Sequence, residues 1–205
     1  MFNAENKTDV QQRILEVASD LFIKNGFKGT SVRDIAKASD TSVAMVNYYF
    51  RSKYNLFEKI FEEALNALFD RVFETLNSDL PFFELIEAWI NSYYEILLKY
   101  PQLPIFILHD INHNPKRLIS HLMKRDPYNV FRSLEKRIKT ETEMGLIKET
   151  PVFDFILNML SLCVFPFIFR NLTTSLSGAS NEEYDELLKE HKKYVFQFII
   201  NALKK

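Results

Sequence analysis

The segment SVRDIAKASDTSVAMVNYYFRSK, residues 31–53, decides the fold of this chain. Ser31 is a good helix N-cap, and Asp34 follows three positions later, as in a capping box. The apolar residues behind Ser31 recur at helical spacing. We therefore predict a short helix over residues 32–38.

A second short helix is predicted over residues 43–49, with Ser42 as its cap. Only the four residues 39–42, Ser42 included, separate the two helices. Two short helices joined by a tight turn form a helix-turn-helix, in which the first helix braces against the DNA backbone and the second enters the major groove. The segment therefore predicts a DNA-binding element.

The second helix is suited to this role at both of its ends. Small side chains at its start allow close approach to base edges, and hydroxyls beside free backbone N–H groups suit phosphate oxygens. Phenol groups at its end and a lysine just beyond it add further donors to phosphates. The residues with these properties are Thr41, Ser42, Val43, Ala44, Tyr48, Tyr49 and Lys53.

Helices are also predicted on both sides of the segment. Apolar positions over residues 9–25 mark a first helix, which Gly26 ends. A long amphipathic helix follows over residues 53–76. Together these elements predict a three-helix domain over residues 8–54.

The rest of the chain, residues 55–205, is predicted to be a helical domain. With only 4 glycines and 7 prolines, the chain is poor in turn residues, which argues against a β-rich fold. Proline marks most helix starts. The predicted helices beyond residue 76 cover residues 81–99, 104–112, 127–144, 151–172 and 181–203. The expected fold is all-α, with about nine helices.

Composition bounds the environment of the protein. The net charge of −1 argues against a general nucleic-acid coat, although the first sixty residues carry a small basic excess. The single cysteine, Cys163, lies in an apolar run, is expected to be buried and suits a reducing compartment. No apolar run reaches about 18 residues, and the N-terminus is polar. We therefore expect a cytoplasmic protein without membrane association.

Residues 14–61 resemble the DNA-binding domain of the tetracycline-repressor (TetR) family. The resemblance rests on ILEVASDLFIKNGFKGTSVRDIAKAS, residues 14–39, and VNYYFRSKYNLFEKIF, residues 46–61. It implies a ligand-binding and dimerisation domain behind the helix-turn-helix. It further implies phosphate contacts and base contacts by two groups of residues. These are Thr30 or Ser31, Tyr48, Tyr49 and Lys53 for phosphates, and Val43, Ala44 and Asn47 for bases.

The chain departs from the family pattern at three positions. Asp40 stands in the turn where members often have glycine, and aspartate tolerates the left-handed conformation better than most residues. Thr41 replaces a frequent apolar residue before the cap. Asn47 replaces a frequent aromatic residue, and asparagine can pair bidentately with adenine. The operator preference of relatives therefore does not transfer simply.

The C-terminal domain is rich in phenylalanine, since most of the 19 in the chain lie beyond residue 60. Such a helical body either packs an ordinary aromatic core or encloses a small hydrophobic or aromatic ligand. Mid-helix positions predict the residues of such a pocket. They are Phe69, Phe73, Trp89, Tyr93, Phe106, His109, Phe131, Met159 and Phe167.

His109, Asp110 and His113 form an H-D-x-x-H pattern that invites a competing hypothesis. Histidines four apart on a helix can share a metal, and a helical enzyme would then be the alternative. No third ligand, phosphate-binding loop or nucleophile–base set accompanies them. We predict no metal, no cofactor and no catalysis. A purely structural helical adaptor is a third alternative, but it leaves the helix-turn-helix unexplained.

The last two predicted helices carry apolar stripes that suit a homodimer interface or the core of a single subunit. The stripes consist of Phe153, Ile156, Leu157 and Leu160, and of Tyr184, Leu187, Leu188, His191, Val195, Phe198 and Ile199. The resemblance implies that these helices form the dimer. We therefore expect a homodimeric repressor that binds double-stranded operator DNA and is released when a small-molecule effector shifts its conformational equilibrium.

Overall fold

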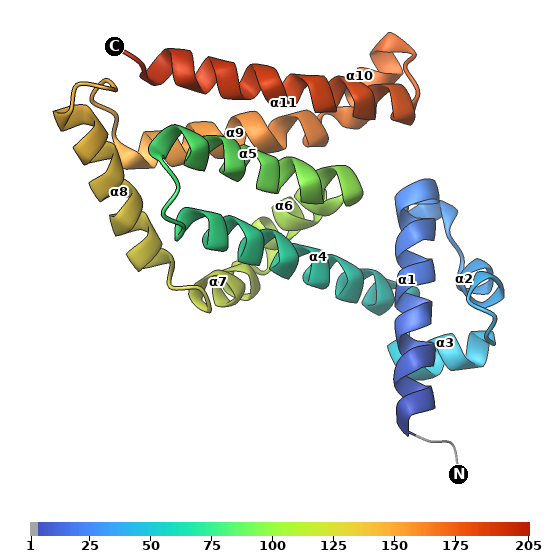
Figure 1. Ribbon diagram of the computed structural model, residues 1–205. Coiled ribbons are helices and arrows are strands. Elements are labelled where there is room, and N and C mark those ends of the chain that lie inside the picture. The colour runs from blue at the N-terminus through green and yellow to red at the C-terminus, as the bar shows by residue number, and fades with distance from the viewer. Residues whose placement is uncertain (1–3) are drawn as a thin grey trace. The chain divides into compact units, whose positions relative to one another are not determined.

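The computed structural model of the chain describes residues 4–205, and their side chains from residue 9 onward, so the first three residues of the polar N-terminus lie outside it. The described chain is all-helical, as predicted (Figure 1). Over these residues there is no strand, only an isolated bridge between Ile147 and Lys204. The helices are α1 (Ala4–Gly29), α2 (Val32–Ala38), α3 (Val43–Phe50), α4 (Lys53–Leu76), α5 (Phe82–Lys99), α6 (Leu103–His113), α7 (Pro115–Met123), α8 (Pro127–Glu143), α9 (Val152–Ile168), α10 (Arg170–Ser177) and α11 (Asn181–Leu203).

The chain divides into two compact units, Met1–Leu65 and Asn66–Lys205. Helix α4 begins in the first unit and ends in the second, so it contributes side chains to both cores. The assignment of DNA binding to residues 8–54 and of ligand binding to residues 55–205 stays a prediction.

The described chain has eleven helices rather than the nine predicted, for two reasons that involve proline. No helix was predicted between residues 112 and 127, but Pro115 is the first residue of α7, where its missing N–H costs nothing. The apolar run over residues 151–172 was taken as one helix. It contains Pro166 and bends by 51° at Phe169, which separates α9 from α10.

No single helix of the described chain is both long and apolar enough to cross a membrane, and only the bent pair α9–α10 meets that requirement jointly.

The first unit confirms the predicted local signals. Ser31 and Asp34 form a reciprocal capping box at the start of α2, and Ser42 Oγ accepts from the Met45 N–H at the start of α3. Gly26 interrupts α1 with a φ of 70°, a left-handed conformation that favours glycine. These caps fix where each short helix begins, and so which side chains α3 exposes.

The second unit is built around α5, which packs against α9 and α11 (Figure 1). Trp89, Tyr94, Cys163 and Phe167 are buried in this core, and the Tyr94 and Phe167 rings meet edge to face at 5.5 Å. The predicted burial of Cys163 is confirmed, and burial raises the pKa of its thiol to about 12. The thiol is therefore neutral and packs as a small apolar group.

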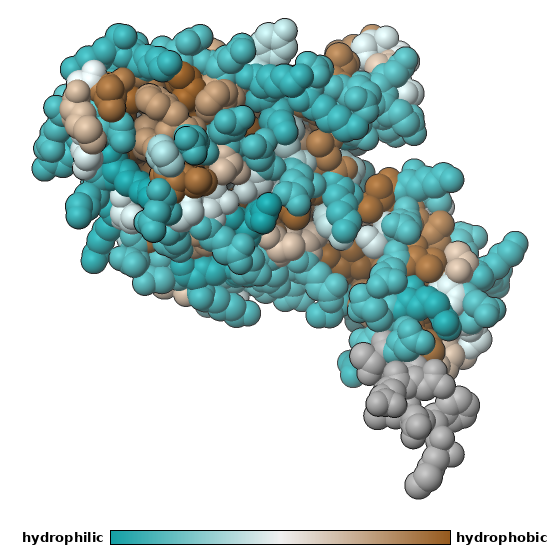
Figure 2. All heavy atoms as spheres, viewed as in Figure 1, coloured by the Kyte–Doolittle hydropathy of each residue, from teal (hydrophilic) through white to brown (hydrophobic). Residues whose placement is uncertain are grey.

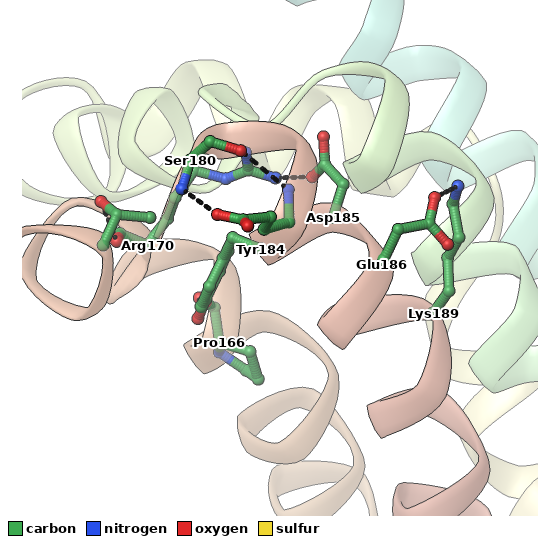
Figure 3. A network of polar contacts seen from close by, with 9 residues as sticks. Pro166, Arg170, Ser180, Tyr184, Asp185, Glu186 and Lys189 are labelled. Carbon is green, nitrogen blue, oxygen red and sulfur yellow. Dashed lines mark hydrogen bonds and ion pairs between the residues drawn. The ribbon is translucent and has the colours of Figure 1, made fainter. Parts of the chain in front are cut away.

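A polar network fastens the bend between α9 and α10 to the start of α11 (Figure 3). Arg170, the first residue of α10, is buried and pairs with Asp185 of α11, while its guanidinium lies 5.4 Å from the centre of the Tyr184 ring. The Tyr184 hydroxyl donates to the Pro166 carbonyl at 2.9 Å. Ser180 caps α11. The network holds the irregular part of this unit in one arrangement.

Candidate nucleic-acid interface and ligand cavity

The leading edge of α3 is open to solvent. Ser42, Val43, Ala44 and Asn47 are all exposed, as the helix-turn-helix prediction requires. Val46 is buried and anchors the opposite face of the helix in the core of the first unit. The four predicted residues thus lie along one outward edge, available to a groove of the right width. Their contacts with DNA remain predictions.

The turn before α3 is a Schellman motif, which ends α2 and fixes the direction in which the chain enters α3. The Thr41 N–H donates to the Ala36 carbonyl at 2.9 Å, and the Asp40 N–H donates to the Lys37 carbonyl at 3.3 Å. Asp40 has a φ of 49°, so the predicted left-handed aspartate is confirmed. The Thr41 hydroxyl lies 3.0 Å from that of Ser39, so it has a partner within the protein.

The aromatic end of α3 divides into an exposed and a buried part. Tyr48 is 65% exposed and Tyr49 is half-buried, with their rings edge to face at 5.2 Å. Tyr48 therefore does not serve as core filler. Phe50, the last residue of α3, is 6% exposed and belongs to the core of the first unit. Tyr48 and Tyr49 keep their predicted phosphate role as a hypothesis.

Two predicted phosphate contacts are engaged inside the first unit. The Thr30 side chain is buried, and its hydroxyl donates to the carbonyls of Leu21 and Gly26 at 3.0 Å each. Lys53 Nζ donates to the carbonyls of Phe27 at 2.8 Å and Thr30 at 2.9 Å. Ser31 is the exposed member of the Thr30–Ser31 pair. Lys53 keeps one N–H for an outside partner, because an ammonium has three.

Met45 is the exposed residue of this edge that the sequence reasoning missed. Its side chain is 37% exposed on the first turn of α3. An apolar side chain in such a place can contact the methyl group of thymine. Methionine at a helical position is usually core, so nothing in the sequence singled it out.

The second unit encloses a cavity of about 660 Å³, within the range of small-molecule sites. Helices α4 to α9 all contribute to its lining. Five of the nine residues predicted for a pocket line it. They are Phe69, Phe73, Trp89, Tyr93 and Phe131.

The other four predicted residues do not line this cavity. Met159 and Phe167 lie on the face of α9 that is buried in the core. Phe106 is also buried, beneath the guanidinium of Arg117 at 5.2 Å. His109 is exposed at the surface of α6. Instead, α6 and α7 supply aliphatic residues, of which Ile111, Leu118 and Leu122 are examples.

The H-D-x-x-H pattern is not assembled as a metal site. Asp110 is buried and accepts from Arg117 Nε at 2.8 Å, so its carboxylate is already paired. The rings of His109 and His113 stack at 4.3 Å on the surface. Among the described residues, no group of three or more side chains is placed to hold a metal ion.

Two aromatic residues of α5 carry polar groups into the apolar region around the cavity. Trp89 and Tyr93, one turn apart, are 3% and 7% exposed. Burial is the main cause that raises the pKa of the Tyr93 hydroxyl, and the nearby Cys163 adds to the shift. The adjacent Trp89 indole opposes the shift, but its Nε1 does not reach hydrogen-bond geometry. The Tyr93 hydroxyl therefore keeps its proton.

Helix α7 connects the cavity wall to α4. Its Leu118 and Leu122 line the cavity, while Arg125 just beyond its end donates to Asp70 Oδ1 at 2.7 Å and to the Asn66 carbonyl at 3.2 Å. His121 of α7 is buried, and its Nδ1 lies 2.9 Å from Asn66 Oδ1. The segment that supplies Leu118 and Leu122 to the cavity is thus hydrogen-bonded to α4.

The surface of α11 has an apolar face that the chain itself leaves uncovered. Leu187, Tyr194 and Phe198 are 59%, 67% and 63% exposed and recur at helical spacing. Of these three, Leu187 and Phe198 belong to the predicted interface stripe and Tyr194 does not. Four members of that stripe fill the subunit's own core, namely Tyr184, Leu188, Val195 and Ile199. Figure 2 shows hydrophobic side chains gathered near the C-terminal end of α11. A patch of this kind favours association.

Comparison with known proteins points in one direction. Residues 14–60 match the family described as "Bacterial regulatory proteins, tetR family". The "Probable HTH-type transcriptional regulator YttP" of Bacillus subtilis is 28% identical over 168 residues, which cover 79% of each chain. The "HTH-type transcriptional repressor KstR2" of Rhodococcus jostii is 28% identical over 95 residues, which are 46% of this chain and 47% of its own.

A solved structure shares the whole fold. A transcriptional regulator from Saccharomonospora viridis in complex with choline superposes with a TM-score of 0.64 at 18% identity, over 97% of this chain and 99% of its own. The fold of both units thus has a precedent.

Proposed function

Because the chain belongs to the tetR family of bacterial regulatory proteins, and is thus a DNA-binding transcriptional regulator, we propose that it is a homodimeric repressor released from its operator by a small hydrophobic ligand. The exposed leading edge of α3 is the observation that carries this proposal. Two dimer-related copies of that edge would enter successive major grooves, about 34 Å apart on one face of the duplex.

Each exposed residue of this edge has a role set by its chemistry. Val43 and Ala44 allow close approach to the bases, and Asn47 pairs with adenine through its amide. Hydroxyls and cations at the borders of the edge contact the phosphates, which set position rather than sequence preference. These border residues are Ser31, Thr41, Ser42, Tyr48, Tyr49 and Lys53.

The dimer forms through the uncovered face of α11. Leu187, Tyr194 and Phe198 would be buried against their symmetry mates, because a two-fold interface pairs the same patch on both subunits. The partly exposed apolar residues Phe153 and Leu157 of α9 extend the patch. A homodimer also matches the two-fold symmetry of an operator with two half-sites.

Ligand and DNA are coupled through α4. A ligand that fills the cavity displaces Leu118 and Leu122, and α7 transmits the displacement through Arg125 to Asp70 and Asn66. An effector can favour the released state only by the difference in its affinity for the two states. Repression fits the name of the relative KstR2, which is a transcriptional repressor.

The ligand of this chain differs in kind from that of the structural neighbour. Choline, bound in the regulator from Saccharomonospora viridis, carries a quaternary ammonium. The cavity of the present chain has only apolar and uncharged side chains in its lining, so an isolated charge would be poorly solvated there. An apolar ligand suits it better.

Selection from a pool of random-sequence duplexes tests the proposal with the full-length protein. We expect recovery of a two-fold symmetric site, and binding of it that weakens steeply with salt. Asn47→Ala should relax selection at one base position of each half-site, whereas the exposed Asn201→Ala control in α11 should leave it unchanged. Recovery of no sequence would contradict DNA recognition by α3.

A further inference from the structure

The lining of the cavity in the second unit has few polar groups. Among its described lining residues, none is charged, and only Trp89, Tyr93 and Ser161 carry side-chain donors. The Ser161 hydroxyl already donates to the Leu157 carbonyl at 2.8 Å. Trp89 and Tyr93 are thus the donors left for a ligand.

The Trp89 indole N–H is an unsatisfied hydrogen-bond donor. It is buried without a hydrogen-bond partner among the described residues, although buried polar groups are normally satisfied. Tyr93 stands one turn further along α5, on the same face of the helix. Its hydroxyl is held in the protonated form by burial, so it can donate. Trp89 and Tyr93 therefore lie together on one wall of an otherwise apolar cavity.

The cavity opens to solvent where its lining residues are exposed. Leu108, Ile111, Leu157 and Phe165 line the cavity but are 38%, 48%, 50% and 52% exposed, whereas Trp89 is 3% exposed. Trp89 and Tyr93 therefore belong to the buried part of the lining, and apolar side chains border the opening. A ligand would place its polar atom inward and its apolar part toward the mouth.

Building on the proposed function, we propose that the effector is an uncharged amphiphile whose single hydrogen-bond-accepting oxygen binds the Trp89 N–H and the Tyr93 hydroxyl, and whose hydrocarbon part fills the cavity. Ketones, esters and alcohols with long alkyl chains have this chemistry. A carboxylate or an ammonium is excluded from the site, because either ion would lose its hydration without meeting a counter-charge.

The first test exploits the fact that Trp89 is the only tryptophan of the chain. Its fluorescence therefore reports occupancy of the cavity directly. We would titrate the full-length protein, stripped of bound lipid, with 2-decanone, decanoate and decyltrimethylammonium below their micellar concentrations. The ketone should bind at least tenfold more tightly than either ion. Equal or tighter binding of an ion would overturn the proposal.

The second test removes the donors singly. Trp89→Phe and Tyr93→Phe keep the aromatic rings, and affinities would be measured by displacement of the neutral dye N-phenyl-1-naphthylamine. Each variant should lower the preference for 2-decanone over 1-decene several-fold. The Phe131→Leu control, a lining residue without a donor, should change both affinities alike. An unchanged preference in the two donor variants would overturn the assignment, and Tyr93→Phe alone decides it if Trp89→Phe does not fold.

Failure of this proposal and failure of the proposed function give different results. Operator binding without any preference for the ketone would contradict only the ligand assignment. Ketone binding that never lowers operator affinity would contradict the repressor mechanism and leave the two-donor site standing.

Discussion

The ammonium of Lys53 donates a hydrogen bond of 2.9 Å to the backbone carbonyl of Thr30, which ties the start of α4 to the end of α1. The same ammonium donates to the Phe27 carbonyl and lies 4.1 Å from the centre of the Phe27 ring. Lys53 is thus a structural residue of the first unit, whether or not its third N–H also reaches a phosphate.

Lys53→Met should lower the free energy of unfolding by about 1–3 kcal/mol, because it leaves two carbonyls without their charged donor. Urea denaturation would measure this. If Lys53 also contacts a phosphate, the slope of log affinity against log salt falls by about one. Lys59→Met removes an exposed ion pair with Glu63 and serves as the control, with little expected effect on stability. Unaltered stability of Lys53→Met would show that the carbonyl contacts contribute nothing.

Asp40 offers a clean test of the turn between α2 and α3. Its φ of 49° is unfavourable for residues with a Cβ, and least so for aspartate and asparagine. Asp40→Gly should therefore be more stable than Asp40→Ala by about 1 kcal/mol. Thermal or urea unfolding would measure the difference. An alanine variant as stable as the glycine variant would argue against the left-handed turn.

Phe198→Glu should convert the protein to a monomer, because it places a charge on the uncovered α11 face that the proposed dimer would bury. Sedimentation velocity would give the oligomeric state, and operator affinity should fall with it. Tyr128→Glu alters an equally exposed aromatic residue of α8 and is the matched control. A Phe198→Glu protein that remains dimeric would place the interface elsewhere.

Cys163 should be unreactive in the folded protein. Burial raises its pKa from 9.0 to about 12, so at pH 8 it is a buried neutral thiol. The disulfide reagent DTNB should label it only after denaturation. The unfolded chain ionises the thiol near pH 9, so this group's contribution to stability is complete below pH 9 and is lost as pH rises from 9 to about 12. The stability of Cys163→Ala should accordingly decline less steeply over that range, and fast labelling of the native protein would contradict the burial.

Arg125 and Asp70 should contribute unequally to the free energy of unfolding. Asp70→Asn should cost under about 1 kcal/mol, because the Asp70 side chain is 58% exposed and solvent screens the pair. Arg125→Leu should cost about 1–3 kcal/mol, because the guanidinium also serves the carbonyls of Asn66 and His121. It should further weaken the response of operator binding to ligand. Equal responses in both variants would argue against coupling through α7.

The first unit was predictable because its signals are local. Ser31, Asp34 and Ser42 mark helix starts through bonds to residues no more than three positions away in the chain. Gly26 marks the interruption of α1. The role of Lys53 was not visible, because its partners lie 23 and 26 residues away in the chain. A residue type that suits phosphate suits a helix C-terminal carbonyl equally well.

The sequence predicted that the second unit is helical and contains a pocket, but not which residues line that pocket. Aromatic residues were chosen for the pocket by type, yet the face of the helix decides which of them line it. On α9, Phe167 faces the core while Phe165 borders the cavity. The aliphatic Leu118 and Leu122 lie on α7, which begins at Pro115 in a stretch for which no helix was predicted.

The exposed apolar mouth of the cavity bears on how the protein should be handled. Because apolar side chains at this entrance are exposed to water, the cavity would admit membrane lipids, detergents and plasticisers during expression and purification. Freshly isolated protein would then carry a mixture of cellular guests, and its apparent affinities would measure their displacement. Solvent extraction followed by mass spectrometry would identify those guests before the first titration.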